Sequence, residues 1–506
     1  MQFFPTCLSI AFLIAPAFAQ DPSELWHKQG GSLYGTDTAA AGDLDQDGYA
    51  DVAIASLNGA EIFSGSTSAL LLTIPPHSGA NLWGSVCTVG DLNGDSIPDY
   101  AVSNSGIDHS GLTNAGGFFL HSGSDGALLY QYFGTESEGF WAYTMEPVGD
   151  VNADGTPDLL VGSSSSLAGI GKAIVYSGLD GSVLHELLGS TNNDQRFCHS
   201  AAAAGDVNHD GYDDFIIGAY ANGTHGIEAG MARVYSGLDG STLFEFLGVN
   251  EDDRFGIAVD AGMDANGDNY PDFVIVADMA EAASANGGVV YVYSGLDGSL
   301  LWDVNDYGSF DIIGRPMFLG DINGDGYDDV SMGGTNGWDH MHIRSGLNGD
   351  LLYDVETPSG DQFAGAMNYL GDVNDDGNDD FCVSGSFADQ YAFVVVYAGV
   401  ATSHSLMLYS RESFVAGTAA LNFVFGTPPS QTVWLLSGSG HGRSFHHTLG
   451  TLDIQNALVV ATQTANISGT ARLKVHIPPR FSGTPIWLQA VNANLEKSNV
   501  VYRVIQ

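Results

Sequence analysis

Short apolar runs separated by turn-forming residues fill the chain up to about residue 400, and acidic segments interrupt them at regular intervals. Continuous runs such as residues 215–218 and 273–276 indicate strands that are buried on both faces. A second run then leads into a glycine-rich turn, as at residues 175–181, and another strand follows. Turns of this kind join hairpin strands, so the pattern predicts antiparallel β-structure.

The acidic segments repeat one motif seven times: Asp, then Asp or Asn at the third position, Asp at the fifth and Asp at the ninth. Successive copies start 48, 59, 56, 58, 57 and 51 residues apart, which is the length of a propeller blade. Four strands per unit and seven units predict an all-β fold, a seven-bladed β-propeller over residues 20–399. The motif residues are Asp43, Asp45, Asp47, Asp51, Asp91, Asn93, Asp95, Asp99, Asp150, Asn152, Asp154, Asp158, Asp206, Asn208, Asp210, Asp214, Asp264, Asn266, Asp268, Asp272, Asp321, Asn323, Asp325, Asp329, Asp372, Asn374, Asp376 and Asp380.

The seventh unit is incomplete, because its turn shortens to Ala398-Gly399 and no matching fourth strand follows. Residues 24–27 (Glu-Leu-Trp-His) read like residues 300–303 (Leu-Leu-Trp-Asp), which form the fourth strand of another unit. We therefore predict that the N-terminal strand completes the last blade and closes the ring.

The motif has the chemistry of a calcium loop. Ca²⁺ prefers six to eight oxygen ligands, and positions one, three, five and nine can supply them together with the backbone carbonyl of position seven. Glycine suits the sharp turn at position six, where Ser96 and Asn269 predict weaker or distorted second and fifth sites. Acidic runs are also typical of solvated turns, but seven copies in phase favour about seven Ca²⁺ ions.

An EF-hand loop begins in the same way but requires a carboxylate at position twelve. That position holds an apolar strand residue in every copy, which excludes an EF-hand. The residues are Ile54, Val102, Val161, Ile217, Ile275, Met332 and Val383.

These loops resemble FG-GAP repeats, because they are followed by apolar strands such as residues 217–220 and preceded by Tyr34-Gly35 or Phe255-Gly256. FG-GAP repeats form the blades of the integrin α-subunit head and of many secreted bacterial proteins. The resemblance covers roughly residues 22–399 and implies calcium in the loops and a role in adhesion or ligand binding. One departure is Met263, which replaces the glycine before the fifth loop.

Residues 1–19 form a hydrophobic stretch that ends Ala17-Phe18-Ala19, a pattern that predicts a signal peptide and a secreted, extracellular or cell-surface protein. No other stretch is long and apolar enough for a transmembrane segment. Removal of the signal peptide would leave three cysteines, which we expect to be buried free thiols: Cys87, Cys198 and Cys382.

Charge marks a boundary near residue 400. The whole chain has a net charge of −46, but residues 398–506 hold seven basic and three acidic side chains, which gives about +4 there and about −50 before it. Such acidity makes nucleic acid an unsuitable partner. Residues 400–506 predict a small antiparallel β-sandwich-like domain. Its stretch 438–447 contains three histidines that could bind a transition metal, although a flexible surface loop is the favoured interpretation.

The sequence contains none of the common hydrolase, metalloprotease or phosphate-binding motifs. His340 and His342 lie in a predicted blade strand, which indicates packing. We therefore expect a non-enzymatic adhesion or ligand-binding protein with an extracellular protein or glycan ligand. The alternative is a polysaccharide-binding lectin or a propeller enzyme that acts on polysaccharide.

Overall fold

The computed structural model describes residues 24–399 apart from 31–33, 57, 78–83, 191–195, 281–287, 306–315, 324, 334–339, 357–361, 375–378 and 388–390, and beyond residue 400 it describes the strands. One compact unit spans Ala19–Val400, and a second contains Ala401–Gln506. The predicted signal peptide and Asp376 lie outside the described residues.

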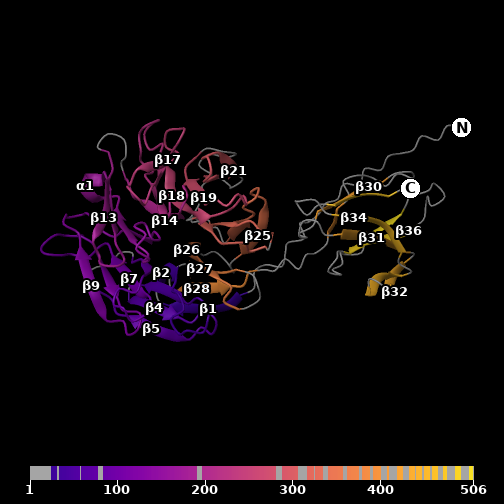
Figure 1. The fold of residues 1–506 in the computed structure, drawn as a ribbon, viewed down its shortest axis with the longest axis horizontal. Coiled ribbons are helices and arrows are strands. Elements are labelled where there is room, and N and C mark those ends of the chain that lie inside the picture. Colours follow the sequence, from indigo (N-terminus) through magenta and orange to yellow (C-terminus); the bar gives the residue numbers. More distant parts are fainter. Residues whose placement is uncertain are drawn as a thin grey trace. The chain divides into compact units, whose positions relative to one another are not determined.

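The described part of the first unit contains seven four-stranded antiparallel sheets, and successive sheets follow one another around a ring (Figure 1). This arrangement confirms the predicted seven-bladed β-propeller. The blades are β2 (Tyr34–Ala40), β3 (Val52–Ser56), β4 (Gly59–Phe63) and β5 (Leu70–Ile74); β6 (Val86–Val89), β7 (Asp99–Asn104), β8 (Gly117–His121) and β9 (Leu128–Phe133); β10 (Thr144–Pro147), β11 (Leu159–Ser163), β12 (Lys172–Tyr176) and β13 (Val183–Leu188); β14 (Ser200–Gly205), β15 (Asp214–Gly218), β16 (Met231–Tyr235) and β17 (Thr242–Leu247); β18 (Phe255–Met263), β19 (Asp272–Ala277), β20 (Val289–Tyr293) and β21 (Leu300–Val304); β22 (Met317–Phe318), β23 (Val330–Gly333), β24 (His340–Arg344) and β25 (Leu351–Glu356); and β26 (Gln362–Gly371), β27 (Asp380–Phe387), β28 (Tyr391–Tyr397) and β1 (Glu24–Gly30).

The hydrophobic core lies between neighbouring blades. The second strand of a blade is buried along its whole length, as in β15 and β19, which agrees with their unbroken apolar sequences. Phe246 of the fourth blade packs against Phe273 of the fifth with ring centroids 5.8 Å apart. The predicted free thiols Cys87, Cys198 and Cys382 are buried in these layers. The only helix among the described residues, α1 (Ser166–Gly169), is one turn in the loop that joins β11 to β12.

The N-terminal strand closes the ring, as the sequence predicted. β1 pairs antiparallel with β28, and the two strands lie side by side in Figure 1 although they are far apart in the sequence. Trp26 of β1 donates from Nε1 to the carbonyl of Gly65 at 2.7 Å, and Trp302 of β21 donates to Gly346 at 2.5 Å. The two tryptophans therefore make equivalent bonds to the turn of the following blade.

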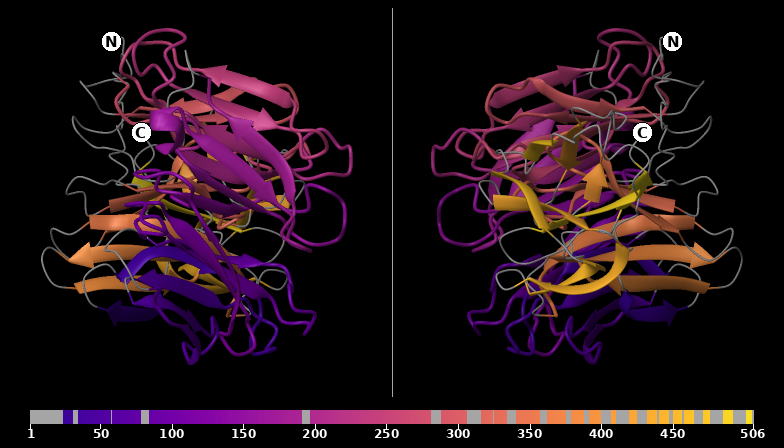
Figure 2. Two further views of the ribbon diagram at one scale, coloured as in Figure 1. Left: turned by 90° about the vertical axis from the view of Figure 1, so that its left-hand side faces the viewer. Right: turned by 90° about the vertical axis from the view of Figure 1, so that its right-hand side faces the viewer.

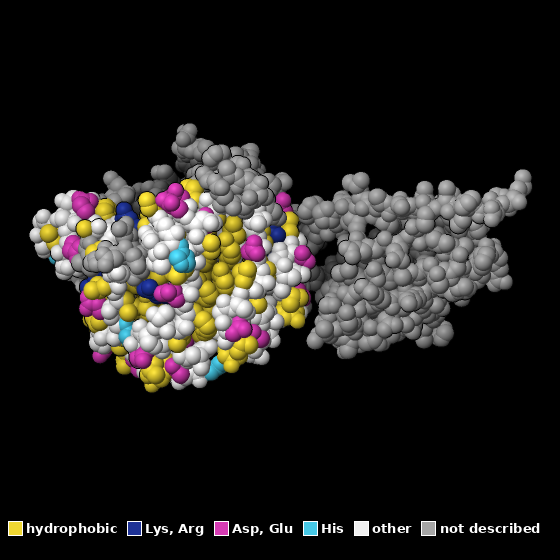
Figure 3. Space-filling view, turned by 90° about the horizontal axis from the view of Figure 1, so that it is seen from above, with side chains coloured by type: hydrophobic (Ala, Val, Ile, Leu, Met, Phe, Trp, Pro, Cys, Tyr) yellow, Lys and Arg dark blue, Asp and Glu magenta, His cyan; other side chains and the backbone are white. Residues whose placement is uncertain are grey.

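Figure 2 shows the nested strands of the blades from two sides, and Figure 3 shows the surface of the described residues. Acidic side chains are scattered over the face drawn in Figure 3, with few Lys or Arg, and hydrophobic side chains gather between them. This surface agrees with the strongly negative sequence.

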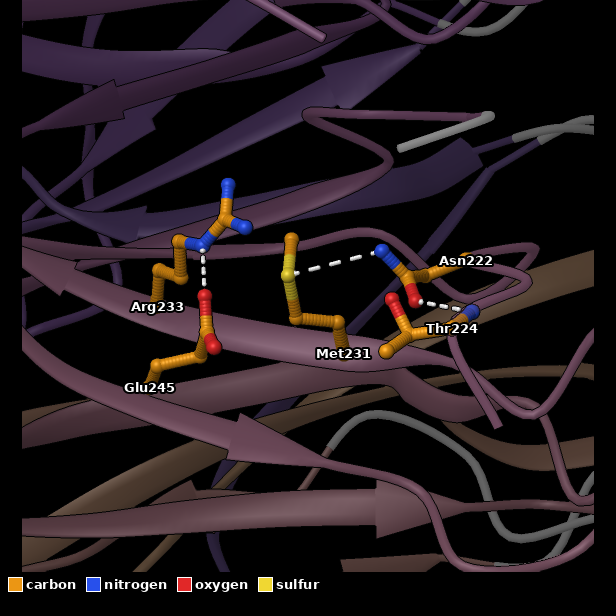
Figure 4. Close-up of polar contacts among 5 residues, drawn as sticks. All are labelled: Asn222, Thr224, Met231, Arg233 and Glu245. Carbon is orange, nitrogen blue, oxygen red and sulfur yellow. Dashed lines mark hydrogen bonds and ion pairs between the residues drawn. The ribbon is translucent and has the colours of Figure 1, made fainter. Parts of the chain in front are cut away.

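Polar contacts fix the strands and the connecting loop of the fourth blade (Figure 4). Arg233 of β16 donates from Nε to Glu245 Oε2 of β17 at 2.6 Å, and these residues are direct cross-strand partners. Asn222 is fully buried; its Nδ2 lies 3.6 Å from the Met231 sulfur, and its Oδ1 accepts the Thr224 N–H at 2.9 Å. The buried amide therefore holds the loop that follows β15.

The C-terminal unit is also built of antiparallel strands: β29 (Met407–Tyr409), β30 (Ala419–Val424), β31 (Thr432–Gly438), β32 (Gly440–His446), β33 (Gly450–Gln455), β34 (Leu458–Thr464), β35 (Ala471–Val475), β36 (Pro485–Val491) and β37 (Val501–Val504). Its sheets have the orders β29-β30-β35, β34-β31-β36-β37 and β32-β33. The interpretation of the histidine-containing stretch as a flexible loop was wrong, because β32 pairs there with β33, from His446 opposite Gly450 to Gly440 opposite Gln455.

Two histidines meet at the junction of the first and second blades. His77 Nε2 lies 2.8 Å from His121 Nε2, and His121 Nδ1 lies 2.9 Å from the Gly126 carbonyl. The His77 ring also stacks on Phe119 at 3.5 Å. Burial and the neighbouring His121 lower the pKa of His77 to about 4, and burial lowers that of His121. The neutral pair therefore belongs to the folded state.

A pKa that is lower in the folded than in the unfolded state makes stability fall with acidification. The contribution of the neutral histidine pair to the free energy of unfolding is fully present above the unfolded histidine pKa, about 6.5, and is lost as pH falls toward 4. We predict that His77→Phe, which can keep the stacking on Phe119, flattens the melting temperature profile between pH 6.5 and 4. His209→Asn, at an exposed loop position, is the control, and equal slopes in wild type and His77→Phe would contradict the prediction.

Candidate cation-binding loops and the axial cavity

Each acidic loop lies between the first and second strands of its blade, and in the first six blades the loop curls around the carboxylate at its first position. In the first loop, Asp43 Oδ1 accepts the N–H of Asp47 and Oδ2 accepts that of Gly48, both at 2.9 Å. Asp206 of the fourth loop accepts the N–H groups of Asp210 and Gly211 in the same way, also at 2.9 Å. These bonds hold each of the two loops in a tight turn around its first carboxylate.

The ninth position is an aspartate that is buried in every loop. Asp214 Oδ2 accepts the Val207 N–H within its own loop, and Oδ1 accepts the N–H of Gly237 in the turn between β16 and β17, both at 3.0 Å. Burial and, to a smaller extent, the neighbouring carboxylates of Asp210 and Asp206 raise the pKa of Asp214 to about 6, although the two hydrogen bonds act to lower it. Each oxygen retains lone-pair capacity for a further partner.

The second and fifth loops keep the bond from the sixth-position N–H to the first aspartate and add one from the fourth position, from Gly94 and Gly267. Ser96 N donates to Asp91 Oδ2 at 2.6 Å, and Asn269 N donates to Asp264 Oδ2 at 2.7 Å. Both residues take the left-handed conformation, with φ of +69° and +67°, in which asparagine is enriched and serine is uncommon. Weaker calcium binding at the second and fifth loops remains a prediction.

The donor set fits a hard divalent cation. Ligand oxygens of Asp43, Asp45 and Asp51 lie within 4.8 Å of one another, and oxygens that share Ca²⁺ at about 2.3–2.6 Å are at most about 5 Å apart. Where asparagine occupies position three, its amide nitrogen can turn toward the ninth aspartate: Asn323 Nδ2 lies 3.1 and 3.0 Å from the two oxygens of Asp329. In the second, third and fourth loops the amide oxygen accepts the N–H of the fifth position and retains a second lone pair for an ion.

A cavity of about 490 Å³ follows the axis of the propeller and is lined by the first strands of the blades. Small residues such as Ala202 leave room, and carboxylates from separate strands line it: Asp37, Glu146, Asp260 and Asp278. Asp260 Oδ2 accepts the Phe318 N–H of the next blade at 2.7 Å, and burial raises the pKa of Asp260 to about 7. This cavity could not be predicted from the sequence, because the residues that line it are far apart in the chain.

One mouth of the cavity carries aromatic and charged side chains. Tyr143 and His199 have ring centroids 5.5 Å apart, and His199 lies edge-to-face on Tyr220 at 4.7 Å. Arg254 lies over the Tyr220 ring at 5.0 Å and reaches Asp278 Oδ2 with Nη1 at 3.3 Å. We call these five residues the mouth cluster. They precede the first strands or follow the second strands, so they lie at the strand ends opposite the acidic loops.

A family model described as an FG-GAP-like repeat matches residues 43–102, and another described as an FG-GAP repeat matches residues 200–235. The first matched segment contains the first two acidic loops, and the second contains the fourth loop with the buried strand after it. Together with the seven-bladed ring, these matches support an FG-GAP, integrin-α-like propeller.

Curated relatives include integrin alpha-5 of Xenopus laevis, which is 26% identical over 212 residues that cover 37% of this chain and 19% of the relative. Integrin alpha-8 of Mus musculus is 27% identical over 37% of this chain and 19% of its own length. Integrin alpha pat-2 of Caenorhabditis briggsae is 32% identical over 26% of this chain and 13% of its own length. The chain thus spans less than a fifth of these relatives. In the described residues, no helix has the length and apolar character needed to cross a bilayer.

Gly237, whose N–H binds the ninth-position Asp214, lies too close to neighbouring backbone for a side chain. A Cβ atom added to Gly237 would lie 2.0 Å from the backbone oxygen of Asp213, so the backbone would have to move. We predict that Gly237→Ala lowers the free energy of unfolding by on the order of 2–4 kcal/mol. The exposed Gly223, where the nearest atom would be 3.7 Å away, is the control. Equal stability of the two variants in denaturant titrations would contradict the role of this close approach.

Proposed function

We propose that this protein is a secreted calcium-binding propeller that serves as a non-enzymatic adhesion or ligand-binding protein. The observation that carries the proposal is the acidic loop, which recurs in all seven blades of an FG-GAP ring. Calcium at each loop would stabilise the ring, and a partner would bind at the mouth cluster. The proposed calcium ligands are the motif residues at positions one, three, five and nine of each loop.

Stabilisation by calcium follows from mass action. An ion that binds only the folded state stabilises it by RT ln(1 + [L]/Kd) per site. With a Kd of about 10⁻⁴–10⁻³ M, as in extracellular modules, each site contributes roughly 0.4–1.4 kcal/mol at about 1 mM Ca²⁺. Seven independent sites would contribute about 3–10 kcal/mol, which is comparable to the stability of a typical domain.

We therefore predict that EDTA markedly lowers the melting temperature of the propeller, and that metal analysis after gel filtration in calcium finds close to seven ions. Asp206→Ala should remove only a fraction of the calcium-dependent shift, because six loops remain. Asp239→Ala, which changes an exposed turn aspartate of the same blade, should leave the shift unchanged. Calorimetry with and without EDTA is the measurement, and identical melting temperatures would contradict the calcium proposal.

The adhesion part of the proposal is supported by the named relatives, which are integrin α-subunits, and by the mouth cluster. Tyrosine and arginine are the side chains that most often dominate the energy of a protein interface. Tyr143 is 39% exposed, so its ring is accessible to a partner. An extracellular protein is the favoured ligand class, and a glycan is the alternative.

We predict that Tyr143→Ala weakens binding to a protein ligand by more than about tenfold. The ligand would first be identified by screening the full chain against immobilised extracellular-matrix proteins and a glycan array. Tyr130→Ala, which truncates an exposed tyrosine of the outer strand β9, is the control. Binding confined to glycans, or turnover of a labelled polysaccharide, would instead support the lectin or enzyme alternative.

A further inference from the structure

In six of the seven acidic loops, the residue at the eighth position contacts the loop of the preceding blade. Three loops have proline there, and its ring lies near the glycine before the preceding loop: a Cβ added to Gly42 would be 3.4 Å from Pro98, and one added to Gly205 would be 3.3 Å from Pro271. Proline offers no N–H and no side-chain acceptor, so these junctions are apolar. The eighth-position residues are Ala50, Pro98, Pro157, Asp213, Pro271, Asp328 and Asp379.

Where the eighth position is aspartate, it hydrogen-bonds the first residue of the preceding loop. Asp213 Oδ2 accepts the Asp150 N–H at 2.8 Å, and Asp213 N donates to the Asp150 carbonyl at 3.1 Å. Asp328 holds Asp264 by the same two bonds, at 2.8 and 3.3 Å. These contacts cross from one blade to the next.

The third aspartate junction follows the same plan. The backbone of Asp321 hydrogen-bonds the Asp379 carboxylate. The Tyr369 hydroxyl donates to Asp379 Oδ1 at 3.1 Å and helps to fix that side chain. Asp379 also lies so close to the preceding loop that a Cβ added to Gly320 would be 2.6 Å from its Oδ2.

We propose that Asp213, Asp328 and Asp379 are positioning residues that couple cation binding between adjacent blades; the inference rests on the proposed calcium function. Asp213 adjoins Asp214, the ninth residue of the fourth loop, and holds Asp150, whose carboxylate organises the third loop through Asp154 and Gly155. An ion that orders the fourth loop therefore also fixes the residue around which the third loop curls. By linkage, each of the two loops strengthens binding at the other equally.

The junctions divide the ring into coupled groups. Aspartate joins the third loop to the fourth, and joins the fifth, sixth and seventh to one another. Proline separates the first loop from the second, the second from the third and the fourth from the fifth, and Ala50 separates the seventh from the first. The seven sites are therefore not seven equal and independent sites.

A double-mutant cycle on the full chain tests the coupling. The measured quantity is the calcium-dependent shift in melting temperature, taken for Asp150→Ala, Asp206→Ala and the double variant. Loss of the fourth site should lower the affinity of the third by about fivefold or more, so the double variant should lose less than the sum of the single losses. Asp43→Ala and Asp91→Ala form the matched cycle across the Pro98 junction, and their losses should add.

Substitution of the positioning residue sharpens the test. Asp213→Ala removes the acceptor and should make the losses at the third and fourth loops additive, whereas Asp213→Asn keeps an acceptor oxygen for the Asp150 N–H and should preserve the coupling. Additive losses at both junctions, or non-additive losses at both, would overturn the inference while leaving calcium binding intact. A wild-type protein without any calcium-dependent shift would overturn the calcium proposal itself and this inference with it.

Discussion

The buried aspartate at the ninth position of each loop is the constraint on which the blade depends. In the fourth blade, Asp214 joins its own loop, through Val207 N–H, to the turn between the third and fourth strands, through Gly237 N–H. A buried carboxylate is costly unless its charge is compensated, and two N–H groups compensate it only in part, because burial still raises its pKa. A cation in the same loop would supply the remaining compensation, so the proposed ion and the buried carboxylate stabilise each other.

The turn glycine extends this connection to the preceding blade. Gly237 donates its N–H to Asp214, and its carbonyl lies 2.5 Å from Nε2 of His185 on the outer strand β13. Trp302 donates to the Gly346 carbonyl and Trp26 to the Gly65 carbonyl, so the same bond recurs at the junction that closes the ring. At these three junctions a blade is therefore bonded to the next one through a glycine that also holds the buried aspartate of an acidic loop.

The sequence predicted the parts of this structure that repeat and are local. The repeat length, the residue pattern of the acidic loops and the apolar strands predicted seven blades. The similarity of residues 24–27 to residues 300–303 predicted the closing strand, which is β1. The sequence did not reveal the strand pairing of β32, because glycine and histidine favour loops on average and only the partner β33 overrides that preference.

The axial cavity and the aspartate junctions were missed for another reason: they depend on contacts between blades, and residues such as Asp150 and Asp213 are 63 positions apart. The eighth position did distinguish the junctions in the sequence, because it varies among proline, aspartate and alanine in an otherwise regular motif.

The direction of the first strands shows where the proposed calcium loops lie relative to the proposed ligand site. Every acidic loop follows a first strand, whereas Tyr143 and His199 precede one and Asp278 follows a second strand that runs back. The loops and the mouth cluster therefore lie at opposite ends of the innermost strands, and an ion held by a loop does not touch a ligand at the mouth. Calcium can then influence binding only through the rigidity and charge of the ring. The innermost strands run from the loops to the mouth and are bonded to one another, as where Asp260 of β18 accepts the N–H of Phe318 in β22, so any loosening of the blades at the loops would also reach the mouth residues.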